Sequence, residues 1–156
     1  MIFRFFLPKI TLAFASFTSI NALWSVSLSF LFKFLEILID DLLVATLTLP
    51  FISPDEVDTV VMHAPGTIKG DSSELLAIEK VFGNKIPLMT SNKWKLGHTF
   101  ASSGLLSMEL AVMMLQKQKF ISTPFKNNTD LKEIKKVLVN AVGFGGNAVS
   151  VLLTLP

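Results

Sequence analysis

The spacing of hydrophobic and polar residues changes several times along the chain, and each change predicts an element. From Phe34 the apolar residues recur at helical spacing, which predicts a helix that ends near residues 49–50. Residues 53–56, Ser-Pro-Asp-Glu, have the form of a capping box around a short turn. The β-branched run at residues 57–62 then predicts a buried strand that ends at His63.

The middle of the chain predicts two helices separated by a short strand. Asp71 and Glu74 fit the N-cap and N3 positions of a helix that continues through apolar residues and stops at Gly83. Residues 86–91 predict the strand. Residues 97–116 predict the next helix, whose apolar side chains recur at helical spacing, so we expect its methionines in the core.

The last part of the chain predicts a β-hairpin. Residues 135–142 form one strand, residues 143–146 the turn, and residues 147–155 the other strand. Three glycines surround Phe144 in the turn, and glycine allows positive φ values there. This motif alone fits both a plain tight turn and a mobile aromatic gate.

Residues 1–40 form an apolar N-terminal segment that differs from the rest of the chain. Residues 10–32 carry no charge, follow Arg4 and Lys9, and are long enough to span a bilayer. Against a membrane segment, this stretch contains many hydroxyl groups, and residues 25–31 alternate like a strand. A membrane segment, a buried strand and helix, and an irregular start therefore all remain open. Residues 41–156 are expected to form one domain.

Composition and charge narrow the function classes. The chain has 156 residues, of which 51% are hydrophobic and 17% charged, and this supports one domain with a substantial core. Its net charge of +2 comes from scattered lysines, so no nucleic-acid groove is expected. Cysteine is absent, which excludes disulfides, thiolate metal sites and a cysteine nucleophile on these residues.

The two histidines of the chain are the strongest candidates for chemistry. His63 and His98 both come after predicted strands, and Lys93 lies five residues before the second. Two strand ends would then bring two imidazoles and an ammonium group to one region. Neutral imidazoles can donate hydrogen bonds to a developing oxyanion, and a nearby lysine can hold one of them in the required state.

Three motifs in this order resemble the C-terminal half of a 3-oxoacyl-[acyl-carrier-protein] synthase, a β-ketoacyl synthase. They are His-Ala-Pro-Gly-Thr at residues 63–67 with Gly-Asp at 70–71 and Glu74, Lys93 to His98, and Gly-Phe-Gly-Gly at residues 143–146. The resemblance covers roughly residues 40–156. It implies an α/β fold, the C-terminal half of the thiolase-like fold, with a mixed sheet packed with helices.

The resemblance also implies roles in a decarboxylative Claisen condensation for fatty-acid or polyketide elongation. His63 and His98 would stabilise the enolate oxygen of a decarboxylated malonyl thioester, and Lys93 would set the electrostatics around His98. Thr67 would contact the pantetheine arm of acyl carrier protein, and Phe144 would gate the acyl pocket. Such enzymes use no metal or other cofactor at this site, and the resemblance implies a cytoplasmic location, with membrane association through residues 10–32 as the alternative.

Several departures from the family pattern limit the resemblance. Pro65 replaces a threonine, Ser107 stands where a glutamate is common, and one residue is missing before Asn147. The family's cysteine nucleophile belongs to a half without a counterpart here. We therefore expect an incomplete or split synthase that dimerises or pairs with a cysteine-bearing half. The alternatives are an inactive partner subunit that binds acyl carrier protein, and a membrane-anchored domain with purely structural histidines.

Overall fold

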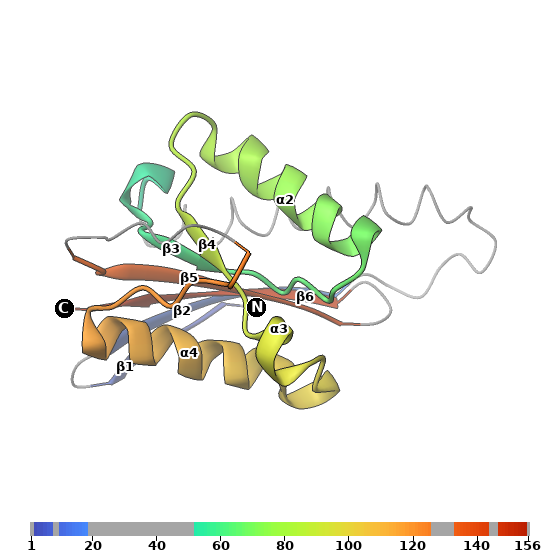
Figure 1. Cartoon of the computed structure of the whole chain (residues 1–156). Coiled ribbons are helices and arrows are strands. Elements are labelled where there is room, and N and C mark those ends of the chain that lie inside the picture. The colour runs from blue at the N-terminus through green and yellow to red at the C-terminus, as the bar shows by residue number, and fades with distance from the viewer. Residues whose placement is uncertain (1, 8–9, 19–51, 126–132, 144–146, 156) are drawn as a thin grey trace.

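The computed structural model describes residues 2–7, 10–18, 52–125, 133–143 and 147–155 (Figure 1). In chain order its elements are β1 (Ile2–Leu7), β2 (Ile10–Thr18), η1 (Pro54–Glu56), β3 (Thr59–Val61), α2 (Ile68–Phe82), β4 (Leu88–Thr90), α3 (Lys93–Leu96), η2 (Phe100–Ser102), α4 (Ser103–Lys117), β5 (Lys136–Gly143) and β6 (Asn147–Thr154). The predicted helix from Phe34, the alternating residues 25–31 and the glycine-flanked Phe144 lie outside the described residues.

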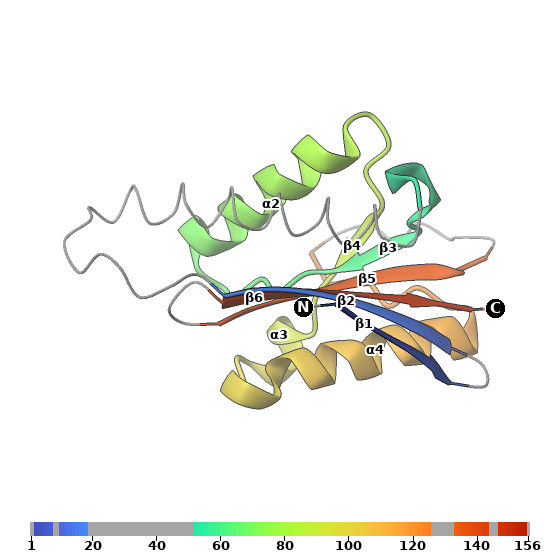
Figure 2. The same cartoon turned by 180° about the vertical axis from the view of Figure 1, so that it is seen from behind.

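The strands form a single mixed sheet in the order β1-β2-β6-β5-β3-β4. β3 runs parallel to both β4 and β5, whereas the pairs β1–β2, β2–β6 and β5–β6 are antiparallel. Figures 1 and 2 show α2 on one face of the sheet and α4 on the other. A mixed sheet packed with helices is the predicted fold class.

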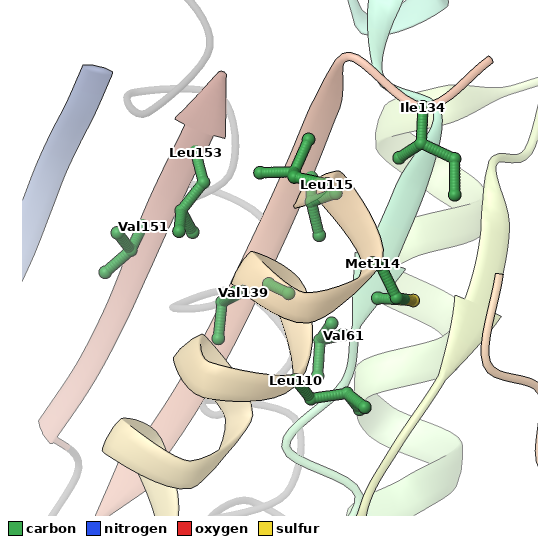
Figure 3. Packing of buried hydrophobic residues seen from close by; sticks show 10 residues of the cluster. Val61, Leu110, Met114, Leu115, Ile134, Val139, Val151 and Leu153 are labelled. Atoms are coloured by element: carbon green, nitrogen blue, oxygen red, sulfur yellow. The ribbon is translucent and has the colours of Figure 1, made fainter. Parts of the chain in front are cut away.

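Two hydrophobic clusters fill the space between the sheet and these helices. The α2 cluster contains Val57, Val60, Ala77, Ile78, Phe82, Leu138 and Leu152. The α4 cluster contains Val61, Leu110, Ala111, Met114, Leu115, Ile134, Val137, Val139, Val151 and Leu153, and Figure 3 shows its α4 side chains against those of the strands. The neighbours Val60 and Val61 belong to different clusters because successive side chains of a strand point to opposite faces.

The predicted strands and the terminal hairpin are present. β3 and β4 lie inside the predicted runs, and β5 pairs with β6 from Lys136↔Thr154 to Gly143↔Asn147. The capping box is also present, because Ser53 N donates a hydrogen bond of 2.9 Å to Glu56 Oε2. The β-branched and aliphatic content of these runs therefore predicted their state correctly.

The predicted starts of both helices are wrong. α2 begins at Ile68, three residues before Asp71, because Thr67 takes the N-cap position and its hydroxyl oxygen accepts a hydrogen bond from Gly70 N. α4 begins at Ser103 and not at residue 97. Gly97 ends the short helix α3 at φ 70°, and Phe100 has φ 50°, so the backbone between them cannot be α-helical.

The N-terminal segment contributes strands to the same sheet. β1 pairs with β2, and β2 pairs with β6 from Thr11↔Thr154 to Thr18↔Asn147. Residues 10–18 are therefore a strand of this sheet, whereas the burial and the helix that the second alternative also predicts lie outside what the structure describes. No helix in the described part of the chain is long and apolar enough to cross a bilayer.

Candidate active site

The turn after β3 holds His63 at the edge of the buried region. The side chain is 7% exposed. Its backbone N–H donates to Glu74 Oε1 at 2.9 Å, and the next N–H, of Ala64, donates to Glu74 Oε2 at 2.8 Å. One carboxylate on α2 thus binds two consecutive amides and fixes the turn that carries the imidazole.

The second imidazole lies directly against the first. The ring centroids of His63 and His98 are 5.3 Å apart and the rings are inclined by 86°. His98 Nδ1 accepts a hydrogen bond of 3.2 Å from Phe100 N. In the neutral imidazole the proton is therefore on Nε2, which can donate.

His98 reaches this position differently from the prediction. It does not follow a strand end directly, because β4 is succeeded by α3, and Lys93 is the first residue of that helix. Backbone strain accompanies the arrangement. Ala64, next to His63, has φ 34°, and Phe100, two residues after His98, has φ 50°. Non-glycine residues with positive φ concentrate at functional sites, where the surrounding structure maintains them.

Lys93 points its ammonium group at neutral oxygen atoms. Its Nζ lies 3.2 Å from Asn92 Oδ1 and 3.4 Å from Ser107 Oγ, and it is half-buried. Burial lowers the pKa of Lys93, while the charge of Glu74 acts in the opposite direction. The residue at the position of the expected glutamate, Ser107, therefore contacts the lysine without supplying a negative charge.

The electrostatics of the site keep His63 neutral. Burial, followed by the nearby charges of Lys93 and His98, lowers the pKa of His63 from 6.5 to about 4. Burial raises the pKa of Glu74, and the hydrogen bonds from Ala64, His63 and Asn140 oppose that rise. At neutral pH the site can therefore present an uncharged imidazole from His63 beside His98.

The two predicted substrate-binding residues differ in what the structure describes. Thr67 is exposed at the start of α2, and since its oxygen already accepts from Gly70 N, its hydroxyl hydrogen is available to a ligand. Phe144 lies outside the described residues. Within the described ranges, no group of three or more histidine, aspartate or glutamate side chains could hold a metal ion.

Sequence reasoning missed several polar residues around the site. Glu74 was expected as a helix-capping residue but is a buried acceptor for the histidine turn. Asn140 and Ser150 are each almost fully buried within apolar strands, and Asn92 is buried beside Lys93. The available signal was a single polar residue inside an apolar run, because a buried polar group requires a partner.

Comparison with known proteins gives consistent matches. A family model described as "Beta-ketoacyl synthase, C-terminal domain" matches residues 41–125. The non-reducing polyketide synthase mapC of Penicillium roqueforti is 40% identical over 77 residues, which are 47% of this chain and 3% of that protein. The 3-oxoacyl-[acyl-carrier-protein] synthase 1 of Buchnera aphidicola subsp. Baizongia pistaciae is 29% identical over 113 residues, which are 64% of this chain and 28% of that protein.

A solved structure matches most of the chain. A type II polyketide ketosynthase, AntDE, solved with its acyl-carrier protein AntF, overlaps with a TM-score of 0.72 at 19% identity, covering 92% of this chain and 37% of that one. This overlap confirms the predicted thiolase-like fold. This chain spans much less than the full length of each of these relatives.

Proposed function

The chain belongs to the β-ketoacyl synthase family through that family's C-terminal domain, and from this membership we propose that it supplies the enolate-stabilising half of a decarboxylative condensation site. The domain is of the kind found in fatty-acid and polyketide synthases. The proposed reaction joins an acyl group to the two carbons that remain when a malonyl thioester loses carbon dioxide.

The pair of imidazoles carries this proposal. Loss of carbon dioxide leaves an enolate whose negative charge concentrates on the thioester oxygen, and donors aimed at such an oxygen stabilise the transition state. His63 and His98 have ring centroids 5.3 Å apart, and the lowered pKa of His63 keeps it neutral at pH 7. A neutral imidazole carries one N–H donor, so each histidine would give one hydrogen bond to the same oxygen.

Lys93 would act on the histidines through its charge. In this structure that charge contributes to the low pKa of His63, whereas the family resemblance assigns its influence to His98. The two described side chains that contact the Lys93 ammonium group, Asn92 and Ser107, are neutral and do not cancel its positive charge. We expect the cation to favour an anionic enolate nearby.

The proposed partners are an acyl carrier protein and a cysteine-bearing synthase half. Thr67 would hydrogen-bond the pantetheine arm, and Phe144 would gate the acyl pocket. The fold similarity to a ketosynthase solved with its carrier protein supports the first partner. The absence of cysteine from these 156 residues supports the second, since the acyl group needs a thiolate to attack. The same proposal includes a homodimer as the alternative to the cysteine-bearing half, and a cytoplasmic location.

The absence of cysteine also favours a second candidate, a catalytically inactive partner subunit. Such a subunit would keep the fold and bind acyl carrier protein or a synthase half without turnover. In that case the imidazoles have no reaction to assist, and a His63→Ala variant should bind the carrier as well as the unchanged chain does.

The test measures carbon dioxide release and 3-oxoacyl product from malonyl-acyl-carrier-protein and an acylated carrier. The chain is assayed alone and with a cysteine-bearing N-terminal half of a bacterial 3-oxoacyl synthase. We expect product only on mixing, and a loss of about 10²–10³ in rate for His63→Ala or His98→Ala. Thr59→Val serves as a control because it changes a buried hydroxyl away from the imidazoles. No decarboxylation under either condition would refute the condensing role and leave the partner-subunit role.

A further inference from the structure

Two polar residues face each other in the middle of the apolar hairpin. Asn140 on β5 and Ser150 on β6 are a directly opposed pair in the antiparallel register. Alternation places both on the same face as Leu138 and Leu152, which belong to the α2 cluster. Asn140 is 2% exposed and Ser150 is 1% exposed, so their polar groups need partners inside the protein.

Their partners form a continuous chain of hydrogen bonds that reaches the histidine turn. Ser150 Oγ donates to Asn140 Oδ1 at 2.7 Å, and Asn140 Nδ2 donates to Glu74 Oε1 at 3.1 Å. Glu74 in turn accepts from His63 N and Ala64 N at 2.9 and 2.8 Å. This series of hydrogen bonds therefore connects the terminal hairpin, through Glu74 on α2, to the backbone of His63.

We propose that Asn140 is a positioning residue for His63, acting through Glu74, with Ser150 fixing the orientation of the Asn140 amide. The three donors to Glu74 come from two separate regions, the turn and β5. Asn140 is the donor from β5, and it holds the carboxylate at the place where both turn amides can reach it. This inference rests on the proposed function in one respect, namely that His63 donates a hydrogen bond to a substrate oxygen.

The residue types fit this role closely. The Ser150 hydroxyl donates to one end of the amide, so the other end, Nδ2, is directed at Glu74. An aspartate at position 140 would place a second acceptor about 3 Å from the Glu74 carboxylate, and two carboxylates at that distance cannot both ionise. The neutral amide of asparagine therefore lets the ionised Glu74 accept all three hydrogen bonds, which an ionised aspartate would not.

Charged groups also act on Glu74 and His63, so the test must separate their effects from that of Asn140. The charge of Asp71 on α2 raises the pKa of Glu74, and the charge of Glu74 in turn raises the pKa of Lys93 on α3. Lys93 and His98 act on His63. Asn140 is uncharged, so replacing it removes none of these charges. A change in the amide exchange or the pKa of His63 in such a variant must then come from a change in the position or the ionisation of Glu74.

The test is amide hydrogen exchange of the full chain, followed by NMR, with Asn140→Leu as the main variant and Ser150→Ala as the milder one. A loss of overall stability accelerates by one common factor those core amides that exchange only when the whole protein unfolds, whereas a local loosening accelerates only the amides nearby. We expect the amides of His63 and Ala64 to accelerate by about tenfold more than the β5 amides in Asn140→Leu, and by a smaller factor in Ser150→Ala.

A matched control removes a buried hydroxyl that is outside the chain of hydrogen bonds. Thr59 Oγ1 on β3 is buried and has no hydrogen-bond partner among the residues that the structure describes, so Thr59→Val should leave the His63 and Ala64 amides in step with the rest. A second readout is the titration of the His63 imidazole, whose pKa should rise from about 4 in Asn140→Leu and stay in place in the control.

The outcomes distinguish this inference from the proposed function. Selective acceleration in both variants, without it in Thr59→Val, would support the positioning role even if the chain never decarboxylates malonyl thioesters. Uniform exchange across His63, Ala64 and β5 in Ser150→Ala would overturn it, including in the case that Asn140→Leu does not fold. Neither measurement needs a substrate.

Discussion

Protonation of His63 should destabilise the folded chain, and a pH series can measure the cost. In the fold the pKa of this imidazole is about 4, compared with 6.5 for an ordinary histidine. The folded state therefore binds its proton less readily than the unfolded state does. Stability from this group is fully present above pH 6.5 and is lost as the pH falls towards 4.

The size of the effect follows from the two pKa values. Each tenfold change in proton affinity corresponds to about 1.4 kcal/mol, so the difference between 6.5 and about 4 gives a loss of up to about 3 kcal/mol. Glu74 acts in the opposite sense, because its raised pKa adds stability that is lost as the pH rises through that pKa. The contribution of His63 must therefore be taken as a difference between two proteins.

The assay is urea unfolding followed by circular dichroism, for the unchanged chain and for His63→Gln, at several pH values between 4 and 7.5. Glutamine keeps a polar side chain but does not titrate. We expect the free energy of unfolding of the unchanged chain to fall relative to His63→Gln by up to about 3 kcal/mol across this range. A constant difference between the two proteins at all pH values would refute the argument that burial keeps His63 neutral.

Three further predictions concern the charge near His63, an unpaired hydroxyl and the core. Lys93→Met should raise the pKa of His63 above about 4 but leave it below 6.5, since burial is the larger cause; an unchanged NMR titration would contradict this. Thr59→Val should leave the free energy of unfolding unchanged or raise it by up to about 1 kcal/mol, because Thr59 Oγ1 is buried with no partner in the described part of the chain, and a clear loss in urea unfolding would contradict this. Leu115→Ala should cost about 2–5 kcal/mol in the same assay because Leu115 is fully buried, whereas Leu105→Ala, at a side chain that is 70% exposed, should cost about 0.5 kcal/mol or less.

The sequence predicted the elements of the domain better than their ends. The runs around β3 and β5 are β-branched and apolar, so their state followed from composition. The start of α2 was misplaced because both Thr67 and Asp71 can cap a helix, and only the backbone geometry chooses between them. Asp71 instead accepts a hydrogen bond from Gly66 N in the preceding turn.

The site was predictable in its main residues but not in its supporting ones. His63 and His98 were recognisable because the chain has only these two histidines and each belongs to a motif that resembles one of the family's. Their contact distance, and the support that Glu74 gives to His63, depend on how α2 packs over the sheet. Asn140 is far from His63 in the sequence, so local patterns could not connect the two residues.

The position of β6 in the sheet has a consequence for synthesis. β6 lies between β2 and β5, so a strand that is made after β1, β2, β3, β4 and β5 joins β1 and β2 to the other three, as in the pairing of Thr11 with Thr154. Until residues 147–154 leave the ribosome, one edge of β2 has no partner, and an unpaired strand edge can recruit other chains. A chain truncated before β6 would leave β1–β2 separated from β5-β3-β4, as two smaller sheets and not as one shorter sheet.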